Sequence, residues 1–102
     1  MKISVIIVSY NCKAFLDYCL QSVSKALKQI DSEILVVDNC STDGSVEYLK
    51  SKKYDLRIIE NKENLGFSKA NNKAAKLAKG EYLFFLNPDT IIPEDLIDSF
   101  FK

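Results

Sequence analysis

The chain reads Gly-Glu-Tyr-Leu-Phe-Phe-Leu-Asn-Pro-Asp-Thr at residues 80–90, which predicts a strand followed by a sharp turn. Residues 82–86 are apolar or aromatic without helical spacing, which is typical of a strand buried on both faces of a parallel sheet. Pro88 cannot donate a ladder hydrogen bond, so the strand should end before it. Because open α/β sheets bind ligands at the carboxyl ends of their strands, Asn87 and Asp89 are candidate ligand residues; a plain turn is the alternative.

The rest of the chain alternates strands with helices. Apolar, mostly β-branched runs predict strands at residues 3–8, 34–37 and 56–59. Apolar residues three and four apart predict helices at residues 13–29 and 68–79. A helix capped by Thr42 or Asp43 should run to about residue 50, and Pro93 should be the first residue of a last helix. Gly80 should follow the third helix as its left-handed C′ residue.

This alternation predicts an α/β fold with three layers. Helices should cover both faces of a mainly parallel, Rossmann-like sheet. Right-handed crossovers favour the strand order 3-2-1-4, with a switch point between the first and fourth strands.

The composition indicates one globular domain over residues 1–102, with 47% hydrophobic and 11% aromatic residues. Fourteen basic residues balance fourteen acidic ones, so nothing points to nucleic acid as a partner. No apolar run approaches the roughly 18 residues of a membrane span. Three cysteines and no histidine predict reduced thiols in a cytoplasmic protein, and they exclude histidine-based catalysis and zinc sites. The last helix carries Phe100 and Phe101 and stops one residue later, so we expect the domain to be truncated from a longer protein.

Polar residues at three strand ends should meet on one edge of the sheet. They are Ser9, Tyr10 and Asn11 after the first strand, Asp38 after the second, and residues 87–89 after the fourth. Tyr10 could stack on a nucleotide base, and Asp38 could accept a hydrogen bond from a pyrimidine edge. The alternatives are a strand-end aromatic and a turn-forming aspartate.

Two residues near the start of the third helix could also contact a ligand. Gly66 would permit close backbone approach, although a turn glycine is the alternative. Lys69 could meet a phosphate near the helix N-terminus, although a solvated helix lysine is the alternative.

Four segments carry a family resemblance. They read Ser-Val-Ile-Ile-Val-Ser-Tyr-Asn at residues 4–11, Val-Val-Asp-Asn-Cys-Ser-Thr-Asp-Gly at 36–44, Asn-Leu-Gly-Phe-Ser-Lys-Ala-Asn-Asn at 64–72, and the stretch at 80–90. In this order they resemble family 2 glycosyltransferases, most closely the rhamnosyltransferase-like branch. The resemblance implies the N-terminal half of a GT-A fold and inverting transfer of a sugar from UDP or dTDP to a glycan or lipid-linked acceptor.

The resemblance also implies roles for single residues. The nucleotide would be bound by Ser9, Tyr10, Asn11, Asp38, Gly66, Lys69 and Asn87. Asp89 would hold a Mg²⁺ or Mn²⁺ ion that bridges the diphosphate. Asn87 stands where the family has the first aspartate of its Asp-x-Asp motif and brings no charge, so we expect weaker metal binding.

Family members are at least twice this length, and no residue here matches the carboxylate that deprotonates the acceptor. We therefore expect donor binding without efficient turnover. The full-length protein would act in cell-wall or polysaccharide synthesis. It could associate with the inner face of the membrane and form an oligomer through the exposed C-terminal helix.

Two other classes share this architecture. A dinucleotide-binding Rossmann domain requires a Gly-x-Gly-x-x-Gly turn after its first strand, which residues 9–13 lack. A non-catalytic nucleotide-binding or assembly module of the receiver type would carry an acidic pair there and an aspartate after its third strand. The chain instead has Glu60 and Asn61 after its third strand, and this class remains the alternative.

Overall fold

The sheet has the predicted strand order. A computed structural model describes residues 1–52 and 54–101, in which four parallel strands pair in the order β3-β2-β1-β4. The strands are β1 (Ile3–Ser9), β2 (Ser32–Asp38), β3 (Arg57–Glu60) and β4 (Tyr82–Leu86). The helices are α1 (Lys13–Ala26), α2 (Ser45–Ser51), α3 (Gly66–Leu77) and α4 (Leu96–Ser99). The order of strands in space reverses between β1 and β4, so the switch point lies where the sequence predicts it.

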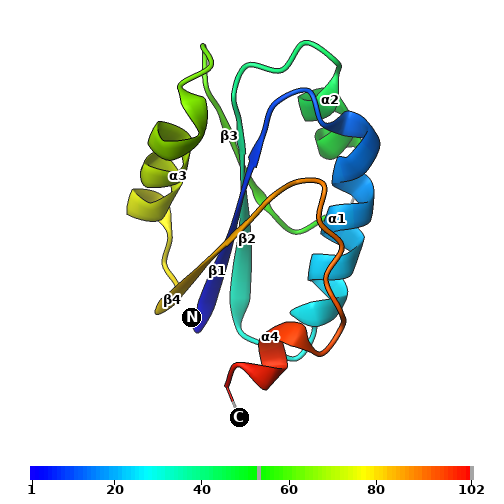
Figure 1. Cartoon of the computed structure of the whole chain (residues 1–102), viewed down its shortest axis with the longest axis vertical. Helices are drawn as coiled ribbons and strands as arrows, with labels where there is room; N and C mark the ends of the chain where they lie inside the picture. Colours follow the sequence, from blue (N-terminus) through cyan, green and yellow to red (C-terminus); the bar gives the residue numbers. More distant parts are fainter. Residues whose placement is uncertain (53, 102) are drawn as a thin grey trace.

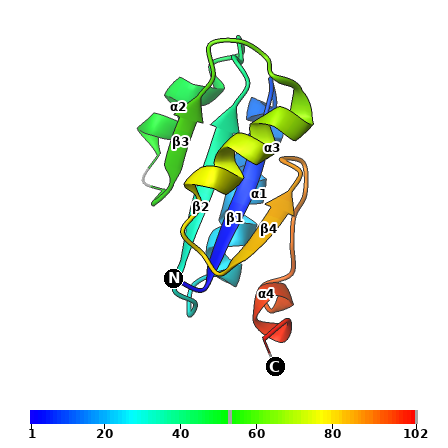
Figure 2. The same ribbon diagram turned by 90° about the vertical axis from the view of Figure 1, so that its left-hand side faces the viewer.

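Helices cover both faces of the sheet, which confirms the three layers (Figures 1 and 2). Strand β1 is buried along its whole length and turns alternate side chains toward two cores. Ile3, Val5 and Ile7 belong to the core that includes the apolar face of α1, whereas Ile6 and Val8 belong to the core beneath α3. The α3 core is the smaller one and closes on alanines of the helix: Ala70 and Ala74.

Strand β4 differs from the prediction, because it is an edge strand and not a strand buried on both faces. Tyr82, Leu83 and Phe85 are 54%, 40% and 48% exposed. β4 pairs only with β1 within the described residues. The aromatic side chains of the chain's end pack beside it, with ring centroids 5.5 Å apart for Tyr82 and Phe101. An apolar run predicts a strand correctly but does not distinguish a central strand from an edge.

The predicted helix boundaries on either side of β4 are also wrong. In addition, α1 ends at Ala26 and not at residue 29, and the N-cap of α2 is Gly44 and not Thr42 or Asp43. Helix α3 ends at Leu77, and Gly80 has no left-handed φ. Glycine is needed at position 80 for another reason: a Cβ there would lie 2.5 Å from the backbone nitrogen of Ser4. At the other boundary, the Pro93 carbonyl accepts the N–H of Leu96 at 3.1 Å. Helix α4 begins only at Leu96, so Pro93 lies in the turn before the helix.

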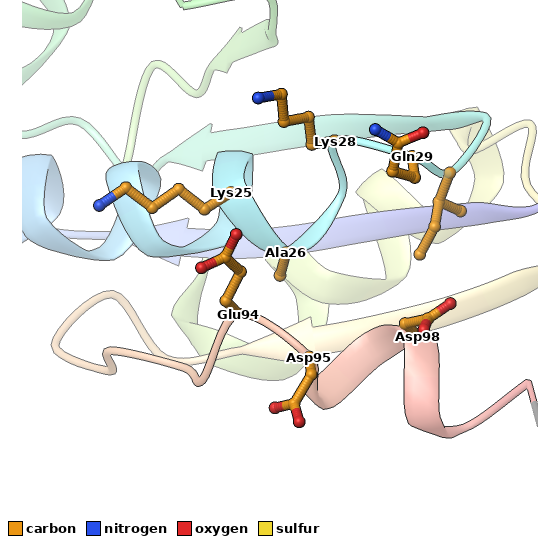
Figure 3. Close-up of a pocket in the computed structure, with 8 residues that line it drawn as sticks. Lys25, Ala26, Lys28, Gln29, Glu94, Asp95 and Asp98 are labelled. Atoms are coloured by element: carbon orange, nitrogen blue, oxygen red, sulfur yellow. The ribbon is translucent and has the colours of Figure 1, made fainter.

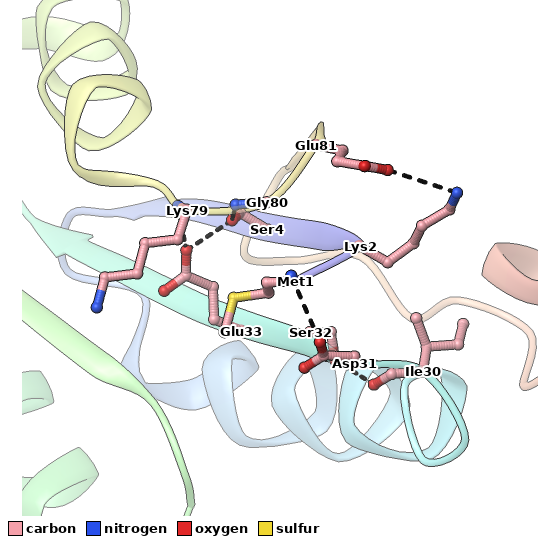
Figure 4. Close-up of polar contacts among 10 residues, drawn as sticks. All are labelled: Met1, Lys2, Ser4, Ile30, Asp31, Ser32, Glu33, Lys79, Gly80 and Glu81. Carbon is pink, nitrogen blue, oxygen red and sulfur yellow. Dashed lines mark hydrogen bonds and ion pairs between the residues drawn. The ribbon is translucent and has the colours of Figure 1, made fainter.

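Glu33 joins the amino ends of the strands (Figure 4). Its Oε2 accepts the hydroxyl of Ser4 at 2.6 Å and the backbone N–H of Lys79 at 2.7 Å, and its Oε1 accepts a guanidinium N–H of Arg57 at 3.1 Å. The Ser4 hydroxyl in turn accepts the N–H of Gly80 at 2.9 Å. Burial raises the pKa of Glu33, but these hydrogen bonds outweigh it and hold the pKa below its ordinary value. The network therefore fixes the connection from α3 to β4 against β1 and β2.

Candidate active site at the carboxyl edge of the sheet

The ends of β1, β2 and β4 lie on one edge of the sheet. Ser9 and Asp38 are register partners, and the backbone N–H of Asn39 donates to the Ser9 carbonyl at 2.9 Å. β4 ends at Leu86, the partner of Ile7, so Asn87 emerges just below the level of Ser9. The strand ends that the sequence predicts to converge therefore do so.

Asn11 joins the loop after β1 to the loop after β2. Its backbone N–H donates to the Ser41 hydroxyl at 2.9 Å, and its side-chain oxygen accepts the N–H of Thr42 at 2.8 Å. Its φ of 51° lies in the left-handed region, which asparagine tolerates better than most residues. Tyr10, beside it, is 48% exposed. The loop is thus held in place while its aromatic ring faces solvent.

Asp38 is buried, with 3% exposure, and both of its carboxylate oxygens have partners. Oδ2 accepts the N–H of Ser41 at 2.9 Å and Oδ1 accepts its hydroxyl at 2.6 Å. This is the turn-forming role that the sequence left open. A ligand N–H at Asp38 would share an oxygen that already accepts one hydrogen bond, which a carboxylate oxygen can do because it has two lone pairs.

Ser9 is fully buried, and its Oγ has no hydrogen-bond partner. Among residues 1–52 and 54–101 it is the one buried side-chain polar atom in this condition. Nearly all such atoms in proteins are paired. The hydroxyl therefore has unused hydrogen-bonding capacity at the switch point.

The start of α3 lies at the same edge. Gly66 has a φ of +80°, and its N–H donates to the side-chain oxygen of Asn64 at 2.9 Å. A Cβ at Gly66 would meet no atom within 4 Å. The backbone conformation, and not a crowded neighbourhood, is therefore what favours glycine here. Lys69 is exposed on the first turn of the helix.

The turn after β4 exposes Asn87 and Asp89. The Asn87 carbonyl accepts the N–H of Thr90 at 3.1 Å and the thiol of Cys19 at 3.8 Å. Burial raises the pKa of Cys19 to about 11, and the charge of Asp89 acts in the same direction, against a hydrogen bond from Thr90. Cys19 therefore stays a protonated thiol beneath the turn.

The acidic residues do not form a metal cage by themselves. Within the described part of the chain, no three Asp, Glu, His or Cys side chains are grouped to hold an ion. Asp89 instead offers a single exposed carboxylate. One carboxylate suits Mg²⁺ or Mn²⁺ that takes its remaining oxygens from phosphate and water.

The sequence pattern of the family described as Glycosyl transferase family 2 matches residues 4–102. The chain belongs to glycosyl transferase family 2. The resemblance carried by the four segments is thereby confirmed at the level of the family. The likeness to its rhamnosyltransferase-like branch stays a prediction.

Similar proteins are much longer than this glycosyltransferase chain. The poly(ribitol-phosphate) beta-glucosyltransferase of Bacillus spizizenii is 39% identical over 102 residues, which cover 95% of the chain and 16% of that protein. Staphylococcus aureus TarS 1–349, solved with UDP-GlcNAc, has a TM-score of 0.86 at 31% identity, over 97% of this chain and 30% of that one. The mannosyltransferase PcManGT from Pyrobaculum calidifontis, solved with GDP-Man and Mn²⁺, has a TM-score of 0.81 at 28% identity, over 92% and 29%. The chain therefore has the expected GT-A fold and spans less than a third of each of these three proteins.

One groove of the glycosyltransferase chain lies away from this edge. It has a volume of about 620 Å³ and separates the end of α1 from α4, at the amino end of the sheet (Figure 3). Lys25 and Lys28 line one wall and Glu94, Asp95 and Asp98 the other. Its mixed charge and its position do not match a strand-end ligand site. No helix in residues 1–52 or 54–101 combines the length and apolar character needed to cross a bilayer.

The sequence did not identify two buried amides at the site, those of Asn39 and Asn61. They are 2% and 6% exposed and are joined by a hydrogen bond of 2.9 Å. The signal available was an asparagine directly after each of two strands. That pattern is also the commonest one for a turn, so it does not identify a buried pair.

Proposed function

We propose that this chain is the donor-binding domain of an inverting, metal-dependent glycosyltransferase that uses a UDP- or dTDP-sugar. One observation carries the proposal: an exposed aromatic ring, a buried carboxylate and an exposed carboxylate, those of Tyr10, Asp38 and Asp89, follow three strands that end at one edge. Family membership supports the reaction class. The TarS structures with UDP and UDP-GlcNAc support a uridine nucleotide.

The nucleoside would bind across the ends of β1 and β2. Tyr10 would stack on the base, because its ring is exposed above the strand end. Asp38 would accept the base N–H through a lone pair that Ser41 leaves free. Ser9 and Asn11 would lie beneath the nucleoside, where the Ser9 hydroxyl lacks a partner.

The diphosphate would lie between α3 and the turn after β4. Gly66 would bring backbone close to it and Lys69 would place a positive charge nearby. Asn87 would bind a ribose hydroxyl, and Asp89 would hold Mg²⁺ or Mn²⁺. When bound, this ion would offset the negative charge on the departing nucleoside diphosphate. The chain's own residues bind and orient the donor.

We assign no catalytic base within residues 1–102, because no residue matches the family's acceptor-side carboxylate. The domain would bind donor with little turnover by itself and would be part of a longer enzyme. Its acceptor would be a glycan or a lipid-linked glycan, by analogy with relatives named for poly(ribitol phosphate) and teichuronic acid. The longer enzyme would act in cell-wall polysaccharide synthesis, in the cytoplasm at the inner face of the membrane.

Self-association is a further part of the proposal. The open edge of β4 and the exposed rings of Phe100 and Phe101 would pair with a second copy. The contact would involve the end of α4, because Phe100 and Phe101, which follow this helix, line a groove beside β4.

Thermal unfolding with nucleotides tests the donor site. UDP or dTDP at millimolar concentration with Mn²⁺ should raise the melting temperature, since a ligand that binds only the folded state stabilises it. Asp89→Ala should abolish the metal-dependent part of the shift. Asp95→Ala is the matched control, because it removes an exposed carboxylate in the groove at the opposite end. The absence of a shift with every nucleoside diphosphate would contradict the proposal and favour a non-catalytic module.

A further inference from the structure

Asn39 connects the end of β2 to the start of α3. Its side-chain Nδ2 donates to the carbonyl of Gly66 at 3.3 Å. Its Oδ1 accepts the side-chain N–H of Asn61 at 2.9 Å and the backbone N–H of Leu65 at 3.4 Å. The Asn39 amide thus holds the Leu65 N–H and the Gly66 carbonyl at the start of α3.

Asn61 extends this connection to β3 and along α3. Its backbone N–H donates to the Asp38 carbonyl at 2.9 Å. Its side-chain oxygen accepts the ammonium of Lys73 at 2.6 Å. The ends of two strands and two positions of α3 therefore form one hydrogen-bonded unit.

We propose that Asn39 is a positioning residue that sets donor affinity without touching the donor. It rests on the proposed function of this edge as the donor site. Asn39 directly follows Asp38, the expected base acceptor, and its amide fixes Gly66, the expected site of backbone approach to the diphosphate. Asp38 and Asn39 are adjacent, so together they set the position of the base-binding part of the donor site relative to the diphosphate-binding part.

The local backbone does not fix this geometry by itself. Helix α3 begins without a side-chain cap from Leu65, and the Asn64 side chain accepts only the Gly66 N–H, not the Leu65 N–H. Gly66 also has the most permissive backbone of any residue type. Without the Asn39 amide, the Leu65 N–H and the Gly66 carbonyl lose a buried partner, and the turn gains alternative conformations. A donor would then have to order the turn on binding, which weakens its affinity.

Two variants separate the roles of the amide's atoms. Asn39→Leu has a similar size and removes all three side-chain hydrogen bonds. Asn39→Asp keeps the acceptor for Leu65 and Asn61 but places an oxygen against the Gly66 carbonyl. Ser4→Ala is the control, because it removes buried hydrogen bonds to Glu33 and Gly80 at the opposite end of the sheet.

Calorimetric titration with UDP and Mn²⁺ gives the first readout. We expect Asn39→Leu to weaken UDP binding about tenfold and Asn39→Asp about threefold, as expected for lost buried hydrogen bonds. Ser4→Ala should lose at least as much melting temperature but keep its affinity within about twofold, because its lost bonds contribute to stability only. If Ser4→Ala weakens UDP as much as Asn39→Leu does, the effect is general destabilisation and the inference is wrong.

Amide hydrogen exchange gives a readout that needs no nucleotide. The Leu65 amide should exchange about tenfold faster in Asn39→Leu than in the wild-type chain, and at the wild-type rate in Ser4→Ala. Unchanged exchange at Leu65 overturns the inference whatever the affinities are. If Asn39→Leu does not fold, Asn39→Ala, which also removes all three side-chain hydrogen bonds, provides the same comparison. A wild-type chain that binds no nucleoside diphosphate overturns the proposed function and the affinity claim, while exchange at Leu65 still decides whether Asn39 fixes the turn.

Discussion

Replacing Gly80 by alanine should destabilise this chain strongly, although alanine is the smallest side chain that can be added. The new Cβ would lie 2.5 Å from the backbone nitrogen of Ser4, 2.6 Å from the carbonyl carbon of Ile3 and 2.8 Å from the Ser4 hydroxyl. Carbon atoms in ordinary contact are about 3.5–4.0 Å apart. Two of the three clashing atoms are backbone of β1, the strand between β2 and β4, so they can retreat only by shifting the sheet.

The magnitude follows from three contributions. Forcing an extra methyl group into a packed interior costs about 1–3 kcal/mol. Weakening the hydrogen bond from the Gly80 N–H to the Ser4 hydroxyl costs about 1 kcal/mol more. Alanine offsets about 0.4–1 kcal/mol of this loss, because it lowers the conformational entropy of the unfolded chain. A net loss of about 2–3 kcal/mol should lower the melting temperature by roughly 10–20 °C for a domain of this size.

Gly66→Ala is the matched control, because it adds the same methyl group where nothing lies within 4 Å. Its cost comes only from the φ of +80° and should be about 1–2 kcal/mol. Urea unfolding followed by circular dichroism should give lower midpoints for both variants, with unchanged m-values. If Gly80→Ala loses no more stability than Gly66→Ala, the backbone of β1 accommodates the added methyl group at little cost, and the packing argument is refuted.

Three further predictions concern charge, capping and the open edge. Hydrogen bonds outweigh burial and hold the pKa of Glu33 below its ordinary value. The ionised carboxylate therefore stabilises the fold at every pH above the unfolded-state pKa. This stabilisation is lost as the pH falls through the folded-state pKa. Glu33→Gln should therefore flatten the decline in unfolding free energy below about pH 5 in urea titrations, and an equally steep decline would contradict this assignment. Asp43→Ala removes the acceptor for the backbone N–H groups of Ser45 and Lys13, both at 3.0 Å, and should cost about 1–2 kcal/mol in the same assay. Phe85→Lys should reduce self-association in sedimentation equilibrium without lowering the melting temperature by more than about 4 °C, because Phe85 is 48% exposed on β4, whose outer edge has no partner strand among the described residues. Unchanged association would show that β4 is not the contact.

Much of the fold was predictable because it depends on local pattern. The buried face of α1, which includes Leu16, Leu20 and Val23, repeats at helical spacing. The strand order follows from the hand of the crossovers, which is nearly invariant. From these two regularities the converging strand ends at Ser9 and Asp38 also follow.

The features that the sequence did not predict depend on contacts between distant residues. Gly80 is required by the backbone of Ser4, at the other end of the chain, and no local pattern records that approach. The bond from Asn39 to Gly66 likewise joins two loops, although each residue alone reads as a turn former. The exposure of Phe85 depends on which strands have a second neighbour, and composition does not specify this.

The pairing of β1 with β4 joins Ile3 to Tyr82, which lie 79 residues apart in the sequence. During synthesis on a ribosome, β1 emerges before β2 and β3, and its partner β4 emerges after them. At about 5–20 residues per second, one edge of β1 stays without its partner for several seconds. β1 can pair with β2 in that interval, while its pairing with β4 closes the longest loop among the three described strand pairs. Nascent chains are thus most vulnerable to wrong strand pairing along the very strand around which the finished sheet is built.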